Sequence, residues 1–205
     1  MNSRPATQTG APDLRLQPLL SLSPLDRGAA AEEVAESAAS AAEAELPRLA
    51  ALLSGKGKQR DFLAAVFDLS PFLRDCVRRR PEILDALFDN TVAERLDAIL
   101  SEIGAAARAE DASESGVMKA LRRLKLEAHF LIALAELAGE AETELTVRRL
   151  SDLADACICA AIDFLLIDAD GQGKLKLVDR QQPGRGSGWI VLGMGKLGAH
   201  ELNFS

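Results

Sequence analysis

The chain has 205 residues, of which 48% are hydrophobic and 27% are charged, and its formal net charge is −7. This composition is typical of a soluble, core-forming protein, and the acidic surplus argues against a general nucleic-acid binder, which normally carries a basic face. Tyrosine is absent and aromatic residues make up only 4%, so we expect helices that pack through alanine and leucine.

The three cysteines predict neither a metal site nor a disulfide framework. Cys157 and Cys159 lie two residues apart on an expected helix, where they point in different directions and cannot easily share a metal ion. No apolar run is long enough to span a bilayer, and we find no signal peptide. We therefore expect a cytoplasmic protein with free thiols and no membrane association.

Residues 1–28 are predicted to form a mobile N-terminal arm. The segment is rich in Pro, Ser, Thr and Gln, a composition typical of a terminus without regular structure. Its leucines are the residues that we expect to dock on the body of the protein: Leu14, Leu16, Leu19, Leu20 and Leu22.

Residues 29–170 are predicted to form a helical region. An alanine-rich helix over 29–53 should break near Pro47, because proline cannot continue a helix. A connector at 54–57 is followed by a short helix at 62–67 and by two helices over 70–84. Each of these two begins near a proline, which the first turn of a helix tolerates.

Three further helices are expected in the second half of this region. Thr91 and Glu94 form a capping box that starts a helix ending near residue 103, and 104–116 should be a loop. Apolar residues at helical spacing predict long helices over 117–138 and 143–167, antiparallel neighbours as in a bundle. The residues expected to face inward on the last helix are Leu150, Leu153, Ala154, Cys157, Ala161, Phe164 and Leu165.

The composition changes after Asp168, and we expect an α/β unit to begin at about residue 171. Residues 174–178 alternate in polarity like a strand, 179–188 should form a loop, and the apolar run Trp189–Leu192 is expected to be a buried strand. The predicted fold class is therefore mainly α: a helical, bundle-like region followed by the start of an α/β domain over 171–205.

Three other candidate sites are better explained as surface or boundary residues. Arg78, Arg79 and Arg80 could bind an anion, but a solvated helix C-terminus is the favoured interpretation. His129 has no second ligand at metal-binding spacing, so a boundary histidine is favoured. Asp152 and Asp155 share a helix face on which Arg148 can pair with Asp152, so an exposed ion-paired face is favoured over a pair of catalytic carboxylates.

A glycine-rich turn with one lysine follows the apolar run Trp189–Leu192. Backbone N–H groups and a cation in such a turn are suited to binding phosphate. The spacing of Gly193, Gly195 and Gly198 fits a dinucleotide fingerprint, but no second strand or acidic residue follows at the required distance. A Walker loop is excluded, because Lys196 is followed by Leu197 rather than by Ser or Thr.

The string Gly-Met-Gly-Lys-Leu-Gly at 193–198, followed by Glu-Leu-Asn-Phe-Ser at 201–205, closely resembles the signature of glutamine synthetase adenylyltransferases/adenylyl-removing enzymes. This family belongs to the polymerase-β-like nucleotidyltransferase superfamily. The segments 70–72, 80–84 and 150–156 resemble the family more weakly, so the resemblance covers most of the chain after about residue 60.

The resemblance implies a nucleotidyltransferase domain beginning at 171–205 and a phosphate-binding role for the turn. The residues that it assigns to nucleotide or phosphate are Gly193, Gly195, Lys196, Gly198, Asn203 and Ser205. In the family, two aspartates that follow this turn hold a divalent metal, Mg²⁺, against the nucleotide. No residue up to Ser205 can replace them, so we assign no catalytic or metal-binding residue and expect this chain alone to be an inactive fragment.

The resemblance also implies the reaction and the partners. Family members have two related halves, one removing AMP from a glutamine synthetase tyrosine by phosphorolysis and the other adding it from ATP. The helical segment before the turn points to the N-terminal, adenylyl-removing half, with ATP, ADP and phosphate as substrates and glutamine synthetase and the PII signal protein as partners. The alternatives are a helical protein-interaction module with an incidental turn, and a dinucleotide-binding oxidoreductase fragment.

Overall fold

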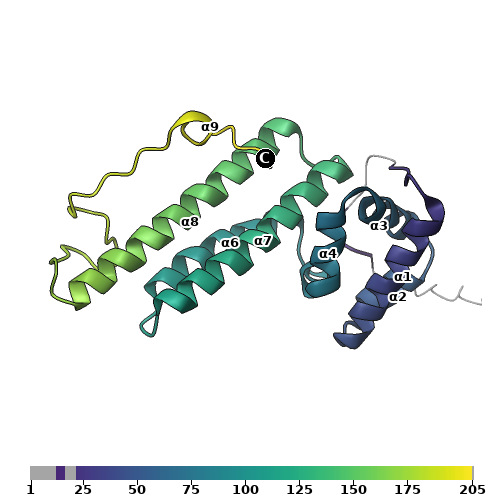
Figure 1. The fold of residues 1–205 in the computed structure, drawn as a ribbon, viewed down its shortest axis with the longest axis horizontal. Helices are drawn as coiled ribbons and strands as arrows, with labels where there is room; N and C mark the ends of the chain where they lie inside the picture. The colour runs from purple at the N-terminus through teal and green to yellow at the C-terminus, as the bar shows by residue number, and fades with distance from the viewer. Residues whose placement is uncertain (1–12, 17–21, 205) are drawn as a thin grey trace, which may run out of the picture. The chain divides into compact units, whose positions relative to one another are not determined.

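The computed structural model describes residues 13–16 and 22–204, and its regular elements are α-helices and one short 3-10 helix (Figure 1). The mainly α fold predicted from composition is thus confirmed. The chain divides into two units, Met1–Thr91 and Val92–Ser205, and each buries apolar side chains of its own. No helix in the described part is long and apolar enough to cross a membrane.

The first unit is built around α1, which packs against α2, α3 and α4. The elements of this unit are α1 (Arg27–Glu43), α2 (Pro47–Ser54), α3 (Lys58–Leu69), α4 (Pro71–Arg79), α5 (Glu82–Asp85) and the 3-10 helix η1 (Ala86–Phe88). The predicted breaks are confirmed, because α2 and α4 begin at their prolines and Pro81 precedes α5. Ser70 caps α4 by accepting a hydrogen bond from the Leu73 amide at 3.3 Å.

The arm of the first unit is held by Gln59 of α3. The Gln59 side chain accepts a hydrogen bond from the Leu14 amide at 2.9 Å and donates to the carbonyls of Leu14 and Leu16 at 2.9 and 2.8 Å. Both leucines are buried, which confirms the expected docking for these two residues. Leu22 is half-buried, and Leu19 and Leu20 lie outside the described residues.

The arginine run at the end of α4 differs from the solvated helix end that was expected. Arg78 is half-buried and forms ion pairs with Glu33 and Glu36 of α1, while Arg80 pairs with Glu82 at 2.8 Å. Glu33 and Glu36 lie about one helical turn apart on α1, so Arg78 forms a contact between α1 and α4 rather than a solvated cation.

The second unit contains three helices that pack pairwise and run up, down and up: α6 (Val92–Arg108), α7 (Glu114–Ala138) and α8 (Thr143–Gly171). The two long helices predicted from periodicity are confirmed. Gly139 ends α7 in the left-handed conformation, with φ at 77°. The loop predicted over 104–116 is shorter, because α6 continues through an alanine-rich turn to Arg108 and α7 starts at a Ser113 cap.

The inward face of α8 agrees with the prediction in part. Leu150, Leu153 and Phe164 are buried as expected, and Ala154, Cys157 and Ala161 are half-buried. Leu165 is 58% exposed, and Leu166 is buried instead. Adjacent helical residues point about 100° apart, so only one of two neighbouring leucines can face α6 and α7.

Neither strand expected after α8 forms among the described residues. The Leu177 amide instead donates to the Asp170 carboxylate at 3.0 Å, which holds residues 174–178 as a loop against the end of α8. The run Trp189–Leu192 is extended but unpaired, and all four side chains are exposed. A strand requires a partner for its backbone N–H and C=O groups, and no described segment pairs with this run.

Candidate functional site

The glycine turn, residues 193–198, is shaped by close backbone contacts. It ends in the four-residue helix α9 (Gly195–Gly198), and Gly195 adopts the left-handed region with φ at 56°. A Cβ atom on Gly198 would lie 2.5 Å from the carbonyl oxygen of Gly193. A side chain at Gly198 is therefore excluded where the two ends of the turn meet, while a Cβ atom on Gly195 would meet no atom within 4 Å.

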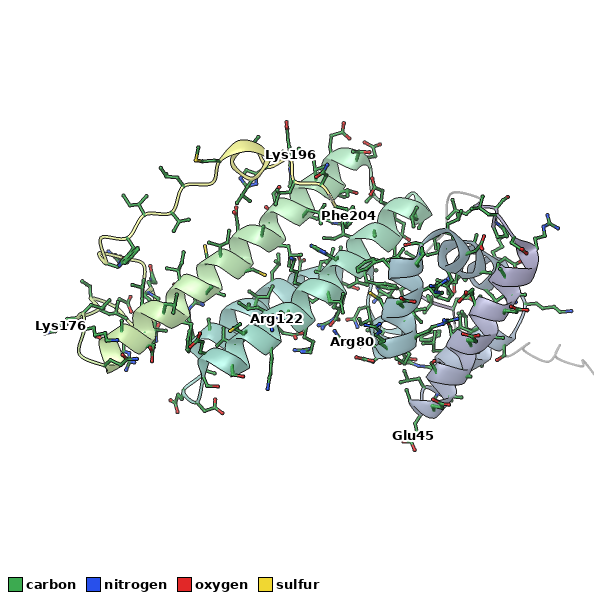
Figure 2. All side chains as sticks on the ribbon, in the orientation of Figure 1. Glu45, Arg80, Arg122, Lys176, Lys196 and Phe204 are labelled. Atoms are coloured by element: carbon green, nitrogen blue, oxygen red, sulfur yellow. The ribbon has the colours of Figure 1, made fainter. Side chains whose placement is uncertain are left out.

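Lys196 is the cation of this turn, and its side chain is exposed (Figure 2). Within the described part of the chain it forms no ion pair, so its charge is not neutralised by a neighbouring carboxylate. The Lys196 carbonyl accepts a hydrogen bond from the Glu201 amide at 2.8 Å, which closes the turn. The residues after Gly171 have more lysines and arginines than acidic residues, so the turn lies in a locally basic segment.

The tail, residues 199–204, returns to the helices of the second unit. Figure 1 shows the chain turning back after α8 and returning, in yellow, towards the N-terminal half of that helix. The Leu202 amide donates to the Ser151 hydroxyl of α8 at 3.2 Å. The Phe204 ring meets the His129 ring of α7 edge to face, with centroids 6.0 Å apart. The glycine turn is thus connected to α7 and α8 by a segment with defined contacts.

A groove of about 510 Å³ lies where the tail meets the two helices. The tail contributes Leu202, Asn203 and Phe204, and the helices contribute Lys125, His129, Leu150, Leu153, Ala154, Cys157 and Ile158. Burial, together with the nearby Lys125 charge, lowers the pKa of His129, so its ring is neutral at pH 7. Burial raises the pKa of the Cys157 thiol, so this cysteine stays protonated.

The structure brings together four of the residues predicted for phosphate, Gly193, Gly195, Lys196 and Gly198, in one turn. Asn203 lies in the tail, between the two residues that contact the helices, and Ser205 lies outside the described residues. The described residues contain no group of His, Cys, Asp or Glu side chains that could hold a metal ion. We therefore assign no metal ligand among them.

The importance of Ser151 and His129 was missed in the sequence. Ser151 occupies a fully buried position among apolar residues of α8, and a hydroxyl at such a position is a signal that it has a partner. His129 was interpreted as a boundary residue, and the sequence contains no local sign that Phe204 would reach it. Asp152, expected to pair with Arg148, instead lies 3.9 Å from His200 of the tail.

A dinucleotide site receives no support from this geometry. Such a site requires the turn to join a strand to a full helix at whose N-terminus the pyrophosphate binds. In the described residues the preceding run is unpaired and α9 has only four residues.

Comparison with known proteins identifies the family. The model of the family described as glutamate-ammonia ligase adenylyltransferase matches residues 61–205. A bifunctional glutamine synthetase adenylyltransferase/adenylyl-removing enzyme of Mesorhizobium japonicum is 68% identical over 94% of the chain. Enzymes of the same name from Brucella suis and Agrobacterium fabrum are 51% and 45% identical over 91% and 78% of the chain.

The chain spans about a fifth of the length of these relatives, with 20%, 19% and 16% of their sequences covered. No solved structure matches it. The family match includes the glycine turn, the tail and all three helices that the second unit packs together. Because the matched region exceeds half of its residues, the chain belongs to the glutamate-ammonia ligase adenylyltransferase family.

Proposed function

We propose that this chain is part of an enzyme that controls glutamine synthetase by adding AMP to a tyrosine and removing it by phosphorolysis. Membership of the family and the names of the relatives support this reaction. The helical lead-in before the glycine turn supports the adenylyl-removing half as the place of this segment. The enzyme acts in the cytoplasm, with glutamine synthetase as its substrate and the PII signal protein as a regulator.

The glycine turn supplies the phosphate contacts in this proposal. In phosphorolysis an oxygen of inorganic phosphate bonds to the phosphorus of AMP, the bond from that phosphorus to the tyrosine oxygen breaks, and ADP leaves while the tyrosine oxygen takes up a proton. Negative charge on the phosphoryl oxygens is the feature that the protein must stabilise. The Lys196 ammonium and the backbone N–H groups of Gly193 and Gly195 provide positive charge in this turn, whereas the Gly198 N–H donates to the Met194 carbonyl at 3.4 Å.

The family resemblance assigns Asn203 and Ser205 to the segment that leads from the turn to the metal site. Mg²⁺, when bound, neutralises phosphate charge and aligns the reacting oxygens. The described residues contain no group of three or more possible metal ligands, and we place no catalytic residue among them. What this part of the chain contributes is binding and orientation: the turn receives phosphate, and the tail fixes the turn to α7 and α8. The observation that carries the proposal is the exposed Lys196, which forms no ion pair with any described residue and lies next to Gly195, where a Cβ atom would meet only open space.

Lys196→Ala tests the proposal in a protein of the relatives' length that contains this chain. The assay follows phosphate-dependent release of ADP from adenylylated glutamine synthetase. We expect kcat/KM to fall by about 10²-fold, the typical cost of removing one preorganised charge partner. Lys176→Ala is the matched control, because Lys176 is an exposed lysine of the same segment outside the turn. Equal activity of the Lys196 and Lys176 variants would refute the phosphate role of the turn.

A further inference from the structure

Ser151 connects α8 to the tail through its hydroxyl group. The side chain is fully buried, and its oxygen lies 3.2 Å from the Leu202 nitrogen, 51 positions further along the chain. The same hydroxyl donates its proton to the Val147 carbonyl, one turn earlier in α8, at 2.8 Å. One buried hydroxyl therefore joins the helix backbone and the tail backbone.

The direction of these two hydrogen bonds restricts what Ser151 can hold. A serine hydroxyl has one proton and two lone pairs, and the proton is used on Val147. The oxygen can then only accept a further hydrogen bond, and the Leu202 N–H donates it. Ser151 thus recognises the main chain at one position, which sets the register of the tail along α8 without depending on a particular side chain.

Contacts at alternate residues of the tail strengthen this anchor. His200 lies 3.9 Å from the Asp152 carboxylate, Leu202 bonds to Ser151, and Phe204 meets the His129 ring. His200 adopts the left-handed region with φ at 55°, and the contacts that follow it tie the tail to both α8 and α7. Asn203, one of the residues predicted to shape the phosphate site, lies between two of them.

We propose that Ser151 is a positioning residue for the phosphate site: its hydroxyl, oriented by Val147, fixes the tail at Leu202 and thereby holds Asn203 and the glycine turn in register with α7 and α8. The inference rests on the proposed function for its catalytic consequence. The anchoring itself is a property of this chain and can be measured without any reaction.

The first test measures amide hydrogen exchange at Leu202 in the 205-residue chain by NMR. In Ser151→Ala we expect exchange to accelerate roughly fivefold or more, the effect of losing one hydrogen bond, while alanine maintains the helix. Ser37→Ala is the matched control, because Ser37 is also fully buried and donates to the Glu33 carbonyl one turn earlier in α1, in the other unit. Ser151→Thr retains the hydroxyl and should exchange as slowly as the wild type.

The outcomes separate clearly. Faster exchange at Leu202 in Ser151→Ala, but not in Ser151→Thr or Ser37→Ala, supports the anchor. If Ser151→Ala exchanges like the wild type, or if Ser151→Thr behaves like Ser151→Ala, the hydroxyl does not hold the tail and the proposal is overturned.

The second test measures phosphorolysis in a protein of the relatives' length that contains this chain. We expect Ser151→Ala to lower kcat roughly tenfold or more through misplacement of the phosphate site, with little change in KM for adenylylated glutamine synthetase. Ser151→Thr should restore kcat, and Ser37→Ala should leave it unchanged. A normal kcat in Ser151→Ala, when Lys196→Ala is impaired, refutes the positioning role. A normal rate in Lys196→Ala refutes the phosphate role of the turn instead and does not affect the exchange result.

Discussion

The Nε atom of Arg95 in α6 lies 2.6 Å from the Glu127 carboxylate in α7, and the whole of Glu127 is only 4% exposed. The Nη1 atom of Arg95 also donates to Glu102 at 2.6 Å, and Arg123 of α7 lies 3.7 Å from the other oxygen of Glu102. The planar guanidinium thus joins carboxylates from two helices, with its inner bond buried and its outer bond near solvent. This arrangement fixes α6 against α7 in the unit that carries the tail.

Arg95→Met should lower the free energy of unfolding of the second unit by about 3 kcal/mol, because it leaves the Glu127 carboxylate buried without its arginine. Arg123→Met is the control on the outer side of the same network, where solvent screens the charges, and should cost less than about 1 kcal/mol. Urea denaturation followed by circular dichroism measures both. Similar losses in the two variants would show that burial of Glu127 is not what makes the inner bond important.

Gln59→Glu should release the arm from the first unit. An ionised carboxylate cannot donate to the carbonyls of Leu14 and Leu16, which now receive the amide hydrogens of Gln59. We expect a loss of about 1–3 kcal/mol from the two unsatisfied carbonyls and faster amide exchange over residues 13–16. Gln181→Glu makes the same charge change at an exposed loop position and should leave that exchange unaltered. Exchange at wild-type rates in Gln59→Glu would mean that the leucines alone hold the arm.

Gly198→Ala should distort the glycine turn with little effect on the rest of the chain. The added Cβ would lie 2.5 Å from the Gly193 carbonyl oxygen, so one end of the turn must move. We expect the amide resonances of residues 193–199 to shift while the free energy of unfolding changes by less than about 1 kcal/mol. In Gly184→Ala, the control, the new Cβ meets no atom within 4 Å. Unchanged resonances in Gly198→Ala would contradict the close contact.

The stability of the second unit should decrease when the pH falls below the pKa of an ordinary histidine. Burial, aided by Lys125, lowers the pKa of His129 from 6.5, so the unfolded chain binds this proton more readily than the folded one. The contribution of neutral His129 is complete above pH 6.5 and is lost as the pH drops through its folded pKa. Urea midpoints between pH 7.5 and pH 5 measure this loss.

His129→Gln should reduce that dependence on pH, since glutamine does not titrate. His200→Gln removes the other histidine of the chain, which is exposed, and should retain the decrease. If the urea midpoints of His129→Gln and of the wild type change in parallel over this range, the titrating group is not His129.

The helices were predictable because their signals are local. Prolines at the starts of α2 and α4, a serine cap on α7 and a left-handed glycine after it act within one turn. The 3.6-residue spacing of apolar side chains then identifies the buried faces of α7 and α8. The strand prediction for Trp189–Leu192 was wrong in the described structure because a strand depends on a partner elsewhere, and apolar character alone does not supply one.

The sequence by itself determined the helical character of this protein and the glycine turn with its lysine, since helix starts, periodicity and glycine spacing are properties of neighbouring residues. The tertiary structure decided the rest: that Glu127 is buried beneath Arg95, that Leu166 rather than Leu165 faces inward, and that the Leu202 amide meets Ser151. These contacts join residues from different helices or from a helix and the tail. Their partners are set by packing in three dimensions, and no local pattern encodes them.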